Sequence, residues 1–300
     1  MTKSSSLNNK LLKVAVQLAL TVAALFIVLS KTDLPRLSEI IRHANPWHLV
    51  AAVLFFNISK LVNAVRLNRF FKSIGLHISS WYNLKLYYLG MFYNLFLPGG
   101  VGGDGYKIFV LRKNHSVTVM NIFNAVFWDR VSGIFALVFL SAALIVPSSF
   151  AALYPQEVHW VWIIAAMAYP LSFILTRLFY RQFIPVFFVT AIESIVVQGT
   201  QLISAWFILT SMSVTAHQID FLAIFLISTV ATILPLTIGG AGAREVTFFY
   251  ALRHLGLDTN IGVALSLIFF AISALSSFAG ILSKIRHENS IDVTDQKAAA

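Results

Sequence analysis

Two glycine-rich segments, each ending in a base, contain the residues best suited to bind an anion. They read Leu-Pro-Gly-Gly-Val-Gly-Gly-Asp-Gly-Tyr-Lys at 97–107 and Leu-Pro-Leu-Thr-Ile-Gly-Gly-Ala-Gly-Ala-Arg at 234–244. Pro98 and Pro235 end their helices, because proline lacks the amide donor and its ring clashes with the preceding turn. The glycines that follow permit tight turns and leave backbone amides uncovered. Each segment therefore predicts a broken helix with free N–H groups.

The half-helices after these breaks are predicted to begin near Asp104 and Ala241. A helix N-terminus has free N–H groups and a partial positive charge, which attract anions. Lys107 and Arg244, one turn into the half-helices, add a full positive charge each. Glycines that only allow close helix packing are the alternative, but two matched breaks, each followed by a base, favour a binding site. The predicted substrate-binding residues are Gly99, Gly100, Gly102, Gly103, Asp104, Gly105, Lys107, Arg130, Gly239, Gly240, Gly242, Arg244 and Glu245.

The composition is that of a membrane protein. Of the 300 residues, 58% are hydrophobic and 11% are charged, whereas soluble proteins have about 45–50% apolar and about 25% charged residues. This excludes a soluble globular protein, a collagen, a disordered chain and a disulfide scaffold, and no nucleic acid is expected as a partner. The absence of cysteine excludes thiolate metal sites and cysteine catalysis. The eight histidines form no pair at i and i+4, so we expect no metal and no cofactor.

Apolar segments long enough, or nearly so, for membrane helices recur along the chain. A spanning helix needs about 20 apolar residues, and lipid offers no hydrogen-bond partner to an open strand edge, so helices are expected throughout. Six runs contain no Asp, Glu, Lys or Arg and two more contain few; they are 14–30, 131–156, 158–176, 194–219, 221–243, 259–283, 47–67 and 86–103. Residues 34–44, with charged side chains on one face and apolar side chains on the other, predict a short helix in the membrane interface.

The glycine-rich segments and the apolar runs around them recur at an offset of 137 residues. Four apolar elements therefore occur twice, in residues 12–146 and 149–283, between an N-terminal segment 1–11 and a tail 284–300. If each glycine-rich element enters and leaves on the same side, each repeat has three crossings, and an odd number makes the repeats inverted. The predicted fold is an all-α polytopic membrane protein of two inverted repeats, each with three crossings and a re-entrant hairpin broken at its Leu-Pro and Gly-Gly residues.

The distribution of bases favours this topology and places both termini in the cytoplasm, with the chain in the cytoplasmic (inner) membrane. The external loops 147–158 and 211–217 carry no Lys or Arg. The bases assigned to cytoplasmic segments include Arg66, Arg69, Lys72, Lys85, Lys107, Arg112, Lys113, Arg177 and Arg181. If all eight elements crossed fully, several of these would lie outside. The bases that the re-entrant arrangement leaves outside are Lys31, Arg36, Arg42, Arg244 and Arg253.

Asp129, Arg130 and Glu193 lie inside the remaining apolar segments. A charge at the membrane centre costs at least about 2.5–3.5 kcal/mol on insertion scales, so each is a functional candidate. Asp129 and Arg130 are adjacent and do not share a helix face, so each needs its own partner. Glu193 is expected to pair with Arg130 or Lys60, or to carry protons. Asp129 and Glu193 are the predicted proton- or ion-coupling residues; a structural ion pair near the interface is the alternative for Asp129 and Arg130.

Three ordered motifs carry a family resemblance. The segments 97–107, 129–133 (Asp-Arg-Val-Ser-Gly) and 235–245 resemble the flippase-like transmembrane domain of lysylphosphatidylglycerol synthases. The resemblance covers nearly the whole chain and implies that a phospholipid or glycolipid moves between the leaflets of a bacterial inner membrane. The bifunctional synthases carry a soluble aminoacyl-transferase domain after the membrane part, whereas this chain ends about seventeen residues beyond its last span. No synthase activity is therefore expected.

The leading hypothesis is a lipid flippase that takes a membrane lipid as substrate and has no enzymatic activity. A polar head group cannot cross hydrocarbon unaided, because it would lose its hydration. Two other classes stay open. One is a lipid-modifying membrane enzyme, although no Asp-x-Asp metal–nucleotide motif is present. The other is a non-transporting partner of a lipid or envelope biosynthesis enzyme. A homo-oligomer and an envelope-biosynthesis partner are both compatible with the sequence.

Overall fold

The computed structural model describes residues 18–19, 21–96, 102–233 and 242–282. Within them all regular structure is helical, so the predicted all-α class is confirmed. The elements are α2 (Leu34–Arg42), α3 (Pro46–Ser73), α4 (Ser80–Phe96), α5 (Gly102–Asn114), α6 (Val119–Ile145), α7 (Ser149–Leu153), α8 (Val158–Phe179), η1 (Arg181–Val186), α9 (Phe187–Ser211), α10 (Gln218–Ile233), α11 (Ala243–His254) and α12 (Thr259–Leu282). The parts of the predicted site and termini that lie outside the described residues are Pro98, Gly99, Gly100, Pro235, Gly239, Gly240, 1–11 and 284–300.

Five of the described helices are long and apolar enough to cross a membrane: Pro46–Ser73, Val119–Ile145, Val158–Phe179, Arg181–Ser211 and Thr259–Ile281. The multi-pass character predicted from the apolar runs is therefore confirmed. A sixth crossing was predicted from residues 14–30, and an apolar helix over Thr21–Lys31 occupies the described part of that run.

The apolar run 131–156 is not one helix. α6 ends at Ile145, and α7 follows a turn that contains Pro147. Proline cannot donate an amide to the preceding turn, so a helix through this position would lose a hydrogen bond. The membrane-spanning helix α6 consequently begins upstream of the uncharged run 131–156, at Val119, and it includes Asp129 and Arg130.

Side-chain caps start α3 and α6, two helices that carry interior charges. The Asn45 side chain accepts a hydrogen bond from the Trp47 N–H at 3.0 Å, with Pro46 as the first residue of α3. The Thr118 hydroxyl accepts one from the Asn121 N–H at 3.3 Å at the start of α6. These bonds satisfy amides that a helix leaves free in its first turn. They set where α3 and α6 begin, and hence the level of their charged side chains.

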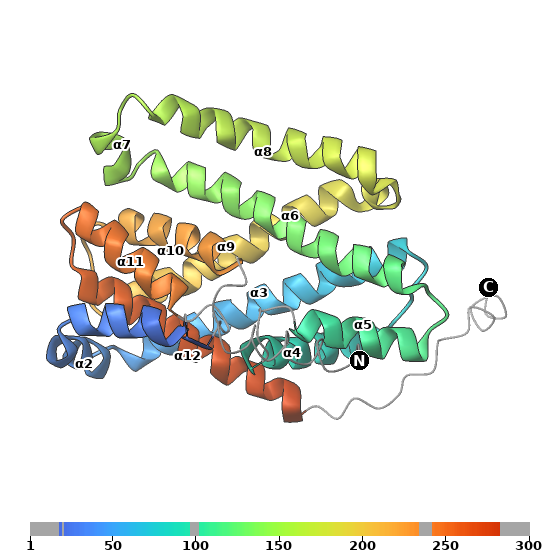
Figure 1. Ribbon diagram of the computed structural model, residues 1–300, viewed down its shortest axis with the longest axis horizontal. Helices are drawn as coiled ribbons and strands as arrows, with labels where there is room; N and C mark the ends of the chain where they lie inside the picture. Colours follow the sequence, from blue (N-terminus) through green and yellow to red (C-terminus); the bar gives the residue numbers. More distant parts are fainter. Residues whose placement is uncertain (1–17, 20, 97–101, 234–241, 283–300) are drawn as a thin grey trace, which may run out of the picture.

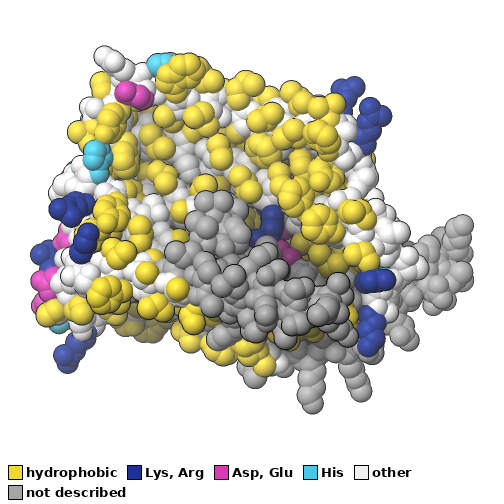
Figure 2. Space-filling model, in the orientation of Figure 1, with side chains coloured by type: hydrophobic (Ala, Val, Ile, Leu, Met, Phe, Trp, Pro, Cys, Tyr) yellow, Lys and Arg dark blue, Asp and Glu magenta, His cyan; other side chains and the backbone are white. Residues whose placement is uncertain are grey.

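The helices run between two ends of the molecule that differ in charge. The connections 74–79, 115–118 and 180–186 lie at one end, at the right of Figure 1, which we call the basic end. Lys and Arg side chains gather along this edge in Figure 2. In the described residues its connections and adjoining helix ends contain no Asp or Glu. Its exposed bases are Lys72, Arg112, Lys113, Arg177 and Arg181.

The opposite end, which we call the mixed end, carries both signs of charge (Figure 2). It collects the connections 43–45, 146–157, 212–217 and 255–258 at the left of Figure 1. Hydrogen bonds join these connections: the Asn45 N–H donates to the Ser211 carbonyl at 2.8 Å, and the Tyr154 hydroxyl lies 2.6 Å from His254 Nε2. Acidic and basic side chains at this end are Asp33, Glu39, Glu157, Asp258, Lys31, Arg36, Arg42, Arg253 and the buried Asp220.

Besides the short helices α2 and α7, four helices of the described chain are too short to run from end to end. α4, α5, α10 and α11 have 17, 13, 16 and 12 residues, which at 1.5 Å per residue gives at most about 26 Å, less than the roughly 30 Å of a bilayer core. α4 begins and α5 ends at the basic end, whereas α10 begins and α11 ends at the mixed end (Figure 1). Each pair packs together as a hairpin, and the two hairpins reach inward from opposite ends.

The longest helix contact is between α3 and α9, which run in opposite directions (Figure 1). Each hairpin packs against a long helix from the other part of the chain: α4 lies along α12, and α10 lies along α6. α8 covers the outer side of α6, where Trp162, Ile163 and Ile174 are exposed. Apolar side chains dominate the described part of the face between the two ends in Figure 2, as expected for a lipid-facing surface.

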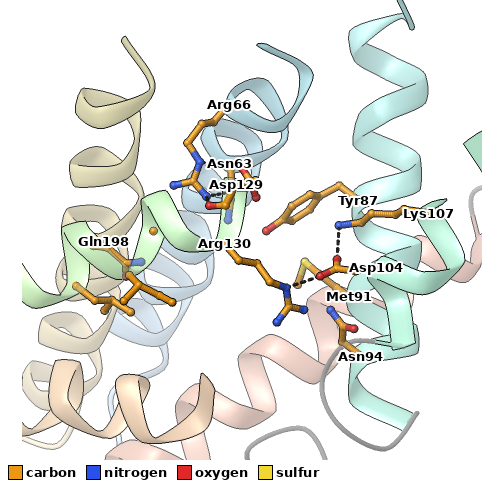
Figure 3. Close-up of a pocket in the computed structure, with 13 residues that line it drawn as sticks. Asn63, Arg66, Tyr87, Met91, Asn94, Asp104, Lys107, Asp129, Arg130 and Gln198 are labelled. Atoms are coloured by element: carbon orange, nitrogen blue, oxygen red, sulfur yellow. Dashed lines mark hydrogen bonds and ion pairs between the residues drawn. The ribbon is translucent and has the colours of Figure 1, made fainter. Parts of the chain in front are cut away.

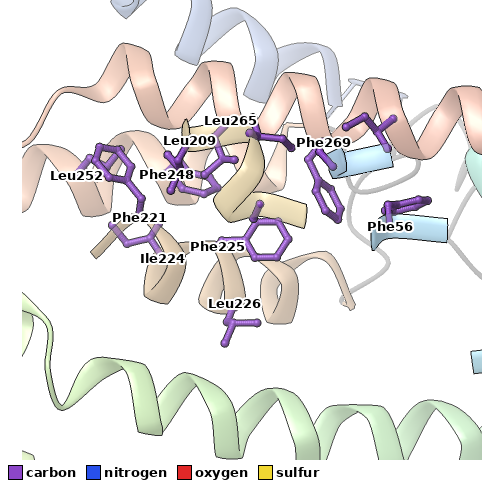
Figure 4. Packing of buried hydrophobic residues seen from close by; sticks show 14 of the residues in the cluster. Phe56, Leu209, Phe221, Ile224, Phe225, Leu226, Phe248, Leu252, Leu265 and Phe269 are labelled. Atoms are coloured by element: carbon purple, nitrogen blue, oxygen red, sulfur yellow. The ribbon is translucent and has the colours of Figure 1, made fainter. Parts of the chain in front are cut away.

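The main apolar core joins α3, α9, α10, α11 and α12, with Leu137 of α6 (Figure 4). Its central contacts are aromatic. The Phe269 ring packs edge-on against Phe56 at 5.4 Å and against Phe225 at 4.7 Å between centroids. All three rings are at most 3% exposed. Because aromatic pairs prefer such tilted geometries, this cluster holds the second hairpin against α3 and α12.

The two halves of the first hairpin touch at glycine. A Cβ added to Gly103 would overlap the backbone carbonyl of Gly90 in α4, whereas one added to Gly105 would have open space around it. Gly103 therefore serves the close packing that was the alternative explanation for these glycines, as small residues often do between membrane helices.

We expect Gly103→Ala to destabilise the protein by about 1–3 kcal/mol, because the helices must move apart to admit the methyl group. Gly105→Ala is the matched control two residues away and is expected to be neutral or slightly stabilising, since alanine is the better helix former. The measurement is the temperature at which each purified variant loses its monodisperse peak in detergent. Equal midpoints for the two variants would contradict this account of Gly103.

Candidate functional site

A polar cavity of about 210 Å³ lies between α3, α4, α5, α6 and α9 (Figure 3). Five charged side chains line it, although the helices around it have apolar outer faces. We call it the first cavity. Its lining residues are Asn63, Arg66, Tyr87, Met91, Asn94, Asp104, Lys107, Asp129, Arg130, Gly133, Ile134, Leu137 and Gln198.

Asp104 joins the first hairpin to α6. Its Oδ1 accepts a hydrogen bond from Lys107 Nζ at 3.2 Å, one turn along α5, and its Oδ2 accepts one from Arg130 Nε. Lys107 also lies over the Tyr87 ring of α4, at 4.5 Å from the centroid. Asp104 and Lys107 are both buried. One carboxylate thus neutralises part of the charge of two bases from different helices.

Asp129 forms a separate ion pair with Arg66 of α3. Arg66 Nε donates to Asp129 Oδ1 at 2.8 Å, and the remaining guanidinium hydrogens reach Ser194 Oγ at 2.8 Å and Asn63 Oδ1 at 2.7 Å. Arg66 is only 2% exposed. A buried guanidinium needs this many acceptors, because each unmatched donor would be desolvated without a partner.

The prediction that Asp129 and Arg130 have separate partners is confirmed, since these are Arg66 and Asp104. The predicted pairing of Glu193 with Arg130 or Lys60 is wrong. Glu193 Oε1 accepts from Arg69 Nε at 2.7 Å, and the Arg69 side chain is 42% exposed. The reason is helical spacing. Arg69 follows Arg66 by one turn of α3, so both side chains lie on the face of α3 that packs against α9 and α6, and Arg69 can reach Glu193 on α9.

A second, smaller cavity of about 130 Å³ lies at the start of α11. We call it the second cavity. It contains two of the predicted site residues, Arg244 and Glu245, together with a lysine of α3 that was not predicted to bind substrate. Its lining residues are Phe56, Lys60, Gln201, Thr232, Arg244, Glu245, Phe269, Phe270 and Ser273.

Glu245 caps α11. Its Oε2 accepts from the Gly242 N–H at 2.7 Å, and its Oε1 accepts from the Ser266 hydroxyl at 2.8 Å. Gly242 has φ +88, in the left-handed region, and an added Cβ would lie 2.7 Å from Ala24 Cβ. Both facts require glycine there. Glu245 and Gly242 therefore set the direction of α11.

Arg244 is held by aromatic rings. Its guanidinium carbon lies 5.3 Å from the Phe225 centroid and 4.9 Å from that of Phe269, and its buried Nε has no hydrogen-bond partner among the described residues. Such contacts attract the cation to the negative face of each ring.

The predicted glycines at the start of α5 differ in their contacts and exposure. The Gly103 N–H donates to Asn94 Oδ1 at 2.8 Å, so this amide at the start of α5 already has a partner within the hairpin. Gly102 is partly exposed and Gly105 is exposed. In the described residues no cluster of three His, Asp or Glu side chains could hold a metal ion.

The predicted residues therefore fall into two neighbouring cavities. Asp104, Lys107, Asp129 and Arg130 line the first, and Arg244 and Glu245 line the second. The cavities follow one another along α3 and along α9, with a single helical turn between lining residues of each. Glu193 lines neither.

Arg66 is the main residue that the sequence placed wrongly. It was assigned to a cytoplasmic connection because it lies near three other bases, yet it is buried in α3. The signal that could have located it is the pattern in which Lys60, Asn63 and Arg66 recur every three residues, on one face of a helix.

The sequence is similar to a described family of membrane proteins. The family model described as the lysylphosphatidylglycerol synthase TM region matches residues 14–192 and 175–280. The UPF0104 membrane protein PH1989 of Pyrococcus horikoshii is 27% identical over 119 residues, which are 39% of this chain and 36% of that protein. The alignment thus spans about a third of that relative.

The two interior ion pairs should differ in their contribution to stability. Asp129→Asn leaves Arg66 buried without a counter-charge and is expected to cost about 3–5 kcal/mol. Glu193→Gln removes the counter-charge of Arg69. Because the Arg69 side chain is partly in solvent, this substitution is expected to cost at most about 1 kcal/mol. Thermal denaturation of both purified variants checks this. A larger loss for Glu193→Gln than for Asp129→Asn would contradict the assignment of Asp129 as the counter-charge of Arg66.

Proposed function

Because the chain belongs to the family of lysylphosphatidylglycerol synthase transmembrane regions, we propose that it is a flippase that carries a phospholipid or glycolipid head group between the leaflets of its membrane. Family membership points to a lipid-related role in a membrane. The observation that supports transport is the pair of polar cavities inside an apolar helix bundle. A head group that enters them exchanges its hydration for fixed charges and amides, while the acyl chains stay in lipid.

The proposed architecture is a pair of inverted repeats, 12–146 and 149–283. Three features support it. The order and lengths of α3–α6 are similar to those of α9–α12. Exchanging the two sets turns the α4–α12 contact into the α10–α6 contact, and both contacts are present. α3 and α9, the corresponding long helices, run in opposite directions. In the proposal the two hairpins are re-entrant, one from each side, as in transporters whose broken helices meet at the substrate.

We further propose that the basic end faces the cytoplasm of a bacterial inner membrane, with both termini on that side. The support is the positive-inside rule together with the excess of bases at that end. Loading from the cytoplasmic leaflet would then bring a head group first to the cavity of the first hairpin.

In the proposed cycle the phosphate of a head group competes with Asp104 for Arg130 and Lys107. Release of the Arg130–Asp104 contact would free α5 from α6, and movement of one repeat against the other would expose the path to the opposite leaflet. Asp129 and Glu193 remain our proposed proton- or ion-coupling residues. The proposal includes no enzymatic step.

Transport is tested by reconstituting the purified protein in vesicles that contain a fluorescent phospholipid and measuring how much of it a membrane-impermeant quencher can reach. We expect the wild-type protein to move lipid, and Lys107→Ala and Arg244→Ala to reduce the rate by at least about tenfold, since each removes a charge from the path. Arg253→Ala, at the exposed end of the same helix as Arg244, is the matched control and should behave as the wild type. Undiminished transport in both Lys107→Ala and Arg244→Ala would contradict the proposal that the lipid head group passes through these two cavities.

The orientation has its own test, because the natural chain contains no cysteine. Lys113→Cys is placed at the basic end and Ala216→Cys at the mixed end, and both positions are exposed. In right-side-out membrane vesicles, a membrane-impermeant maleimide should label the Ala216→Cys variant, and should label the Lys113→Cys variant only after permeabilisation. The reverse pattern would invert the proposed topology.

A further inference from the structure

The second cavity contains two bases whose charges are not matched by ion pairs. In the described part of the chain, neither Lys60 nor Arg244 lies within 4.0 Å of a carboxylate oxygen. Lys60 Nζ instead lies 4.4 Å from the Phe56 centroid, and Arg244 lies over Phe225 and Phe269; Figure 4 labels these three rings. Aromatic faces attract cations but carry no net charge. The cavity therefore presents positive charge to whatever enters it.

The acid that lines this cavity does not provide a direct partner. Both carboxylate oxygens of Glu245 accept hydrogen bonds, from the Gly242 N–H and from the Ser266 hydroxyl. With Glu245 ionised and both bases protonated, the cavity carries one net positive charge. The first cavity has three bases and two carboxylates and so the same net charge, but there each of Arg66, Lys107 and Arg130 contacts a carboxylate.

We propose that Lys60 and Arg244 together bind the singly charged phosphodiester of a membrane lipid in the second cavity. This inference rests on the proposed function and adds Lys60 to its path. One negative charge would bring the cavity to neutrality, and the two bases come from different helices, α3 and α11, so they suit an anion with oxygens on several sides. Gln201 and Ser273 add an amide and a hydroxyl donor to the lining.

The size of the cavity fits a single charged group. Its volume of about 130 Å³ is below the roughly 300–1,000 Å³ of pockets that enclose drug-sized molecules. The glycerol backbone and acyl chains would then remain outside. Arginine also suits this role, because its planar guanidinium can bind two phosphate oxygens at once.

The two cavities form consecutive positions for the phosphate. Lys60 of the second cavity and Asn63 of the first are separated by less than one turn of α3, and Gln201 and Gln198 are spaced in the same way on α9. One turn of helix rises about 5.4 Å. A phosphate released by Arg130 and Lys107 would therefore pass between cavities whose lining residues lie about one turn apart on both helices.

The binding test uses the purified full-length protein in detergent. Native mass spectrometry measures its affinity for phosphatidylglycerol, for an uncharged galactosyl diacylglycerol and for inorganic phosphate. We expect phosphatidylglycerol to bind best, Lys60→Gln to weaken that binding by about tenfold, and Lys60→Arg to retain it within about threefold, since the charge is kept. Lys72→Gln, at the exposed end of the same helix, is the control and should bind as the wild type.

Three results would overturn the inference: equal binding of the uncharged glycolipid, unchanged phosphatidylglycerol binding in Lys60→Gln, or equal loss in Lys60→Arg. Inorganic phosphate that binds as tightly as the lipid would show that the free anion is the ligand and would also overturn it. The transport assay separates this inference from the proposed function. If Lys60→Gln weakens lipid binding but the wild-type protein moves no lipid, the binding site stands and the flippase proposal is wrong. If the wild-type protein moves lipid but Lys60→Gln binds it as the wild type does, the flippase proposal stands and this binding site is wrong.

Discussion

The organisation of this protein depends on one constraint: charged side chains inside an apolar helix bundle must find partners there. Asp104 shows how the constraint acts on the fold, because its carboxylate contacts Lys107 within α5 and Arg130 on α6. The ion pair between Arg66 and Asp129 connects α3 to α6 in the same way. Removing any partner would leave a desolvated charge, so these contacts specify how the first hairpin and the long helices sit together.

The two hairpins meet this constraint in different ways. Lys107 and Arg244 occupy corresponding positions in the two hairpins, as the sixth residue of α5 and the second residue of α11, and each lies over an aromatic ring from the first helix of its hairpin. In the first hairpin the base also has a carboxylate. In the second, the nearby carboxylate of Glu245 is used as a helix cap and Arg244 relies on ring faces. The result is one cavity in which every base contacts a carboxylate, beside one in which Lys60 and Arg244 lie against aromatic rings instead.

Glycine has two separate roles in this arrangement. Gly242 is needed for its left-handed backbone at the start of α11, and Gly103 is needed because α4 and α5 approach too closely for a side chain. The Gly103 amide also donates to Asn94. The backbone at the start of α5 is therefore used partly to close the hairpin, and the side chains of Lys107 and Arg130 provide the charge that faces the cavity.

The sequence by itself determined the helical class, the positions of the five described spans and the resemblance to a lipid-related membrane family. It also identified Asp104, Lys107, Asp129, Arg130, Arg244 and Glu245 as interior charges or residues beside a break. These properties are local: the hydropathy of about 20 residues decides whether a segment can lie in lipid, and proline and glycine act on their own turn of helix.

Only the tertiary structure decided which charges meet. Asp129 pairs with Arg66, Glu193 pairs with Arg69, and Lys60 shares a cavity with Arg244. These partners are separated by 63, 124 and 184 positions in the chain, and hydropathy carries no information on how helices rotate about their axes. The rotation is set by side-chain packing between α3, α6 and α9, because apolar surface alone gives no preference between helix faces when the solvent is lipid.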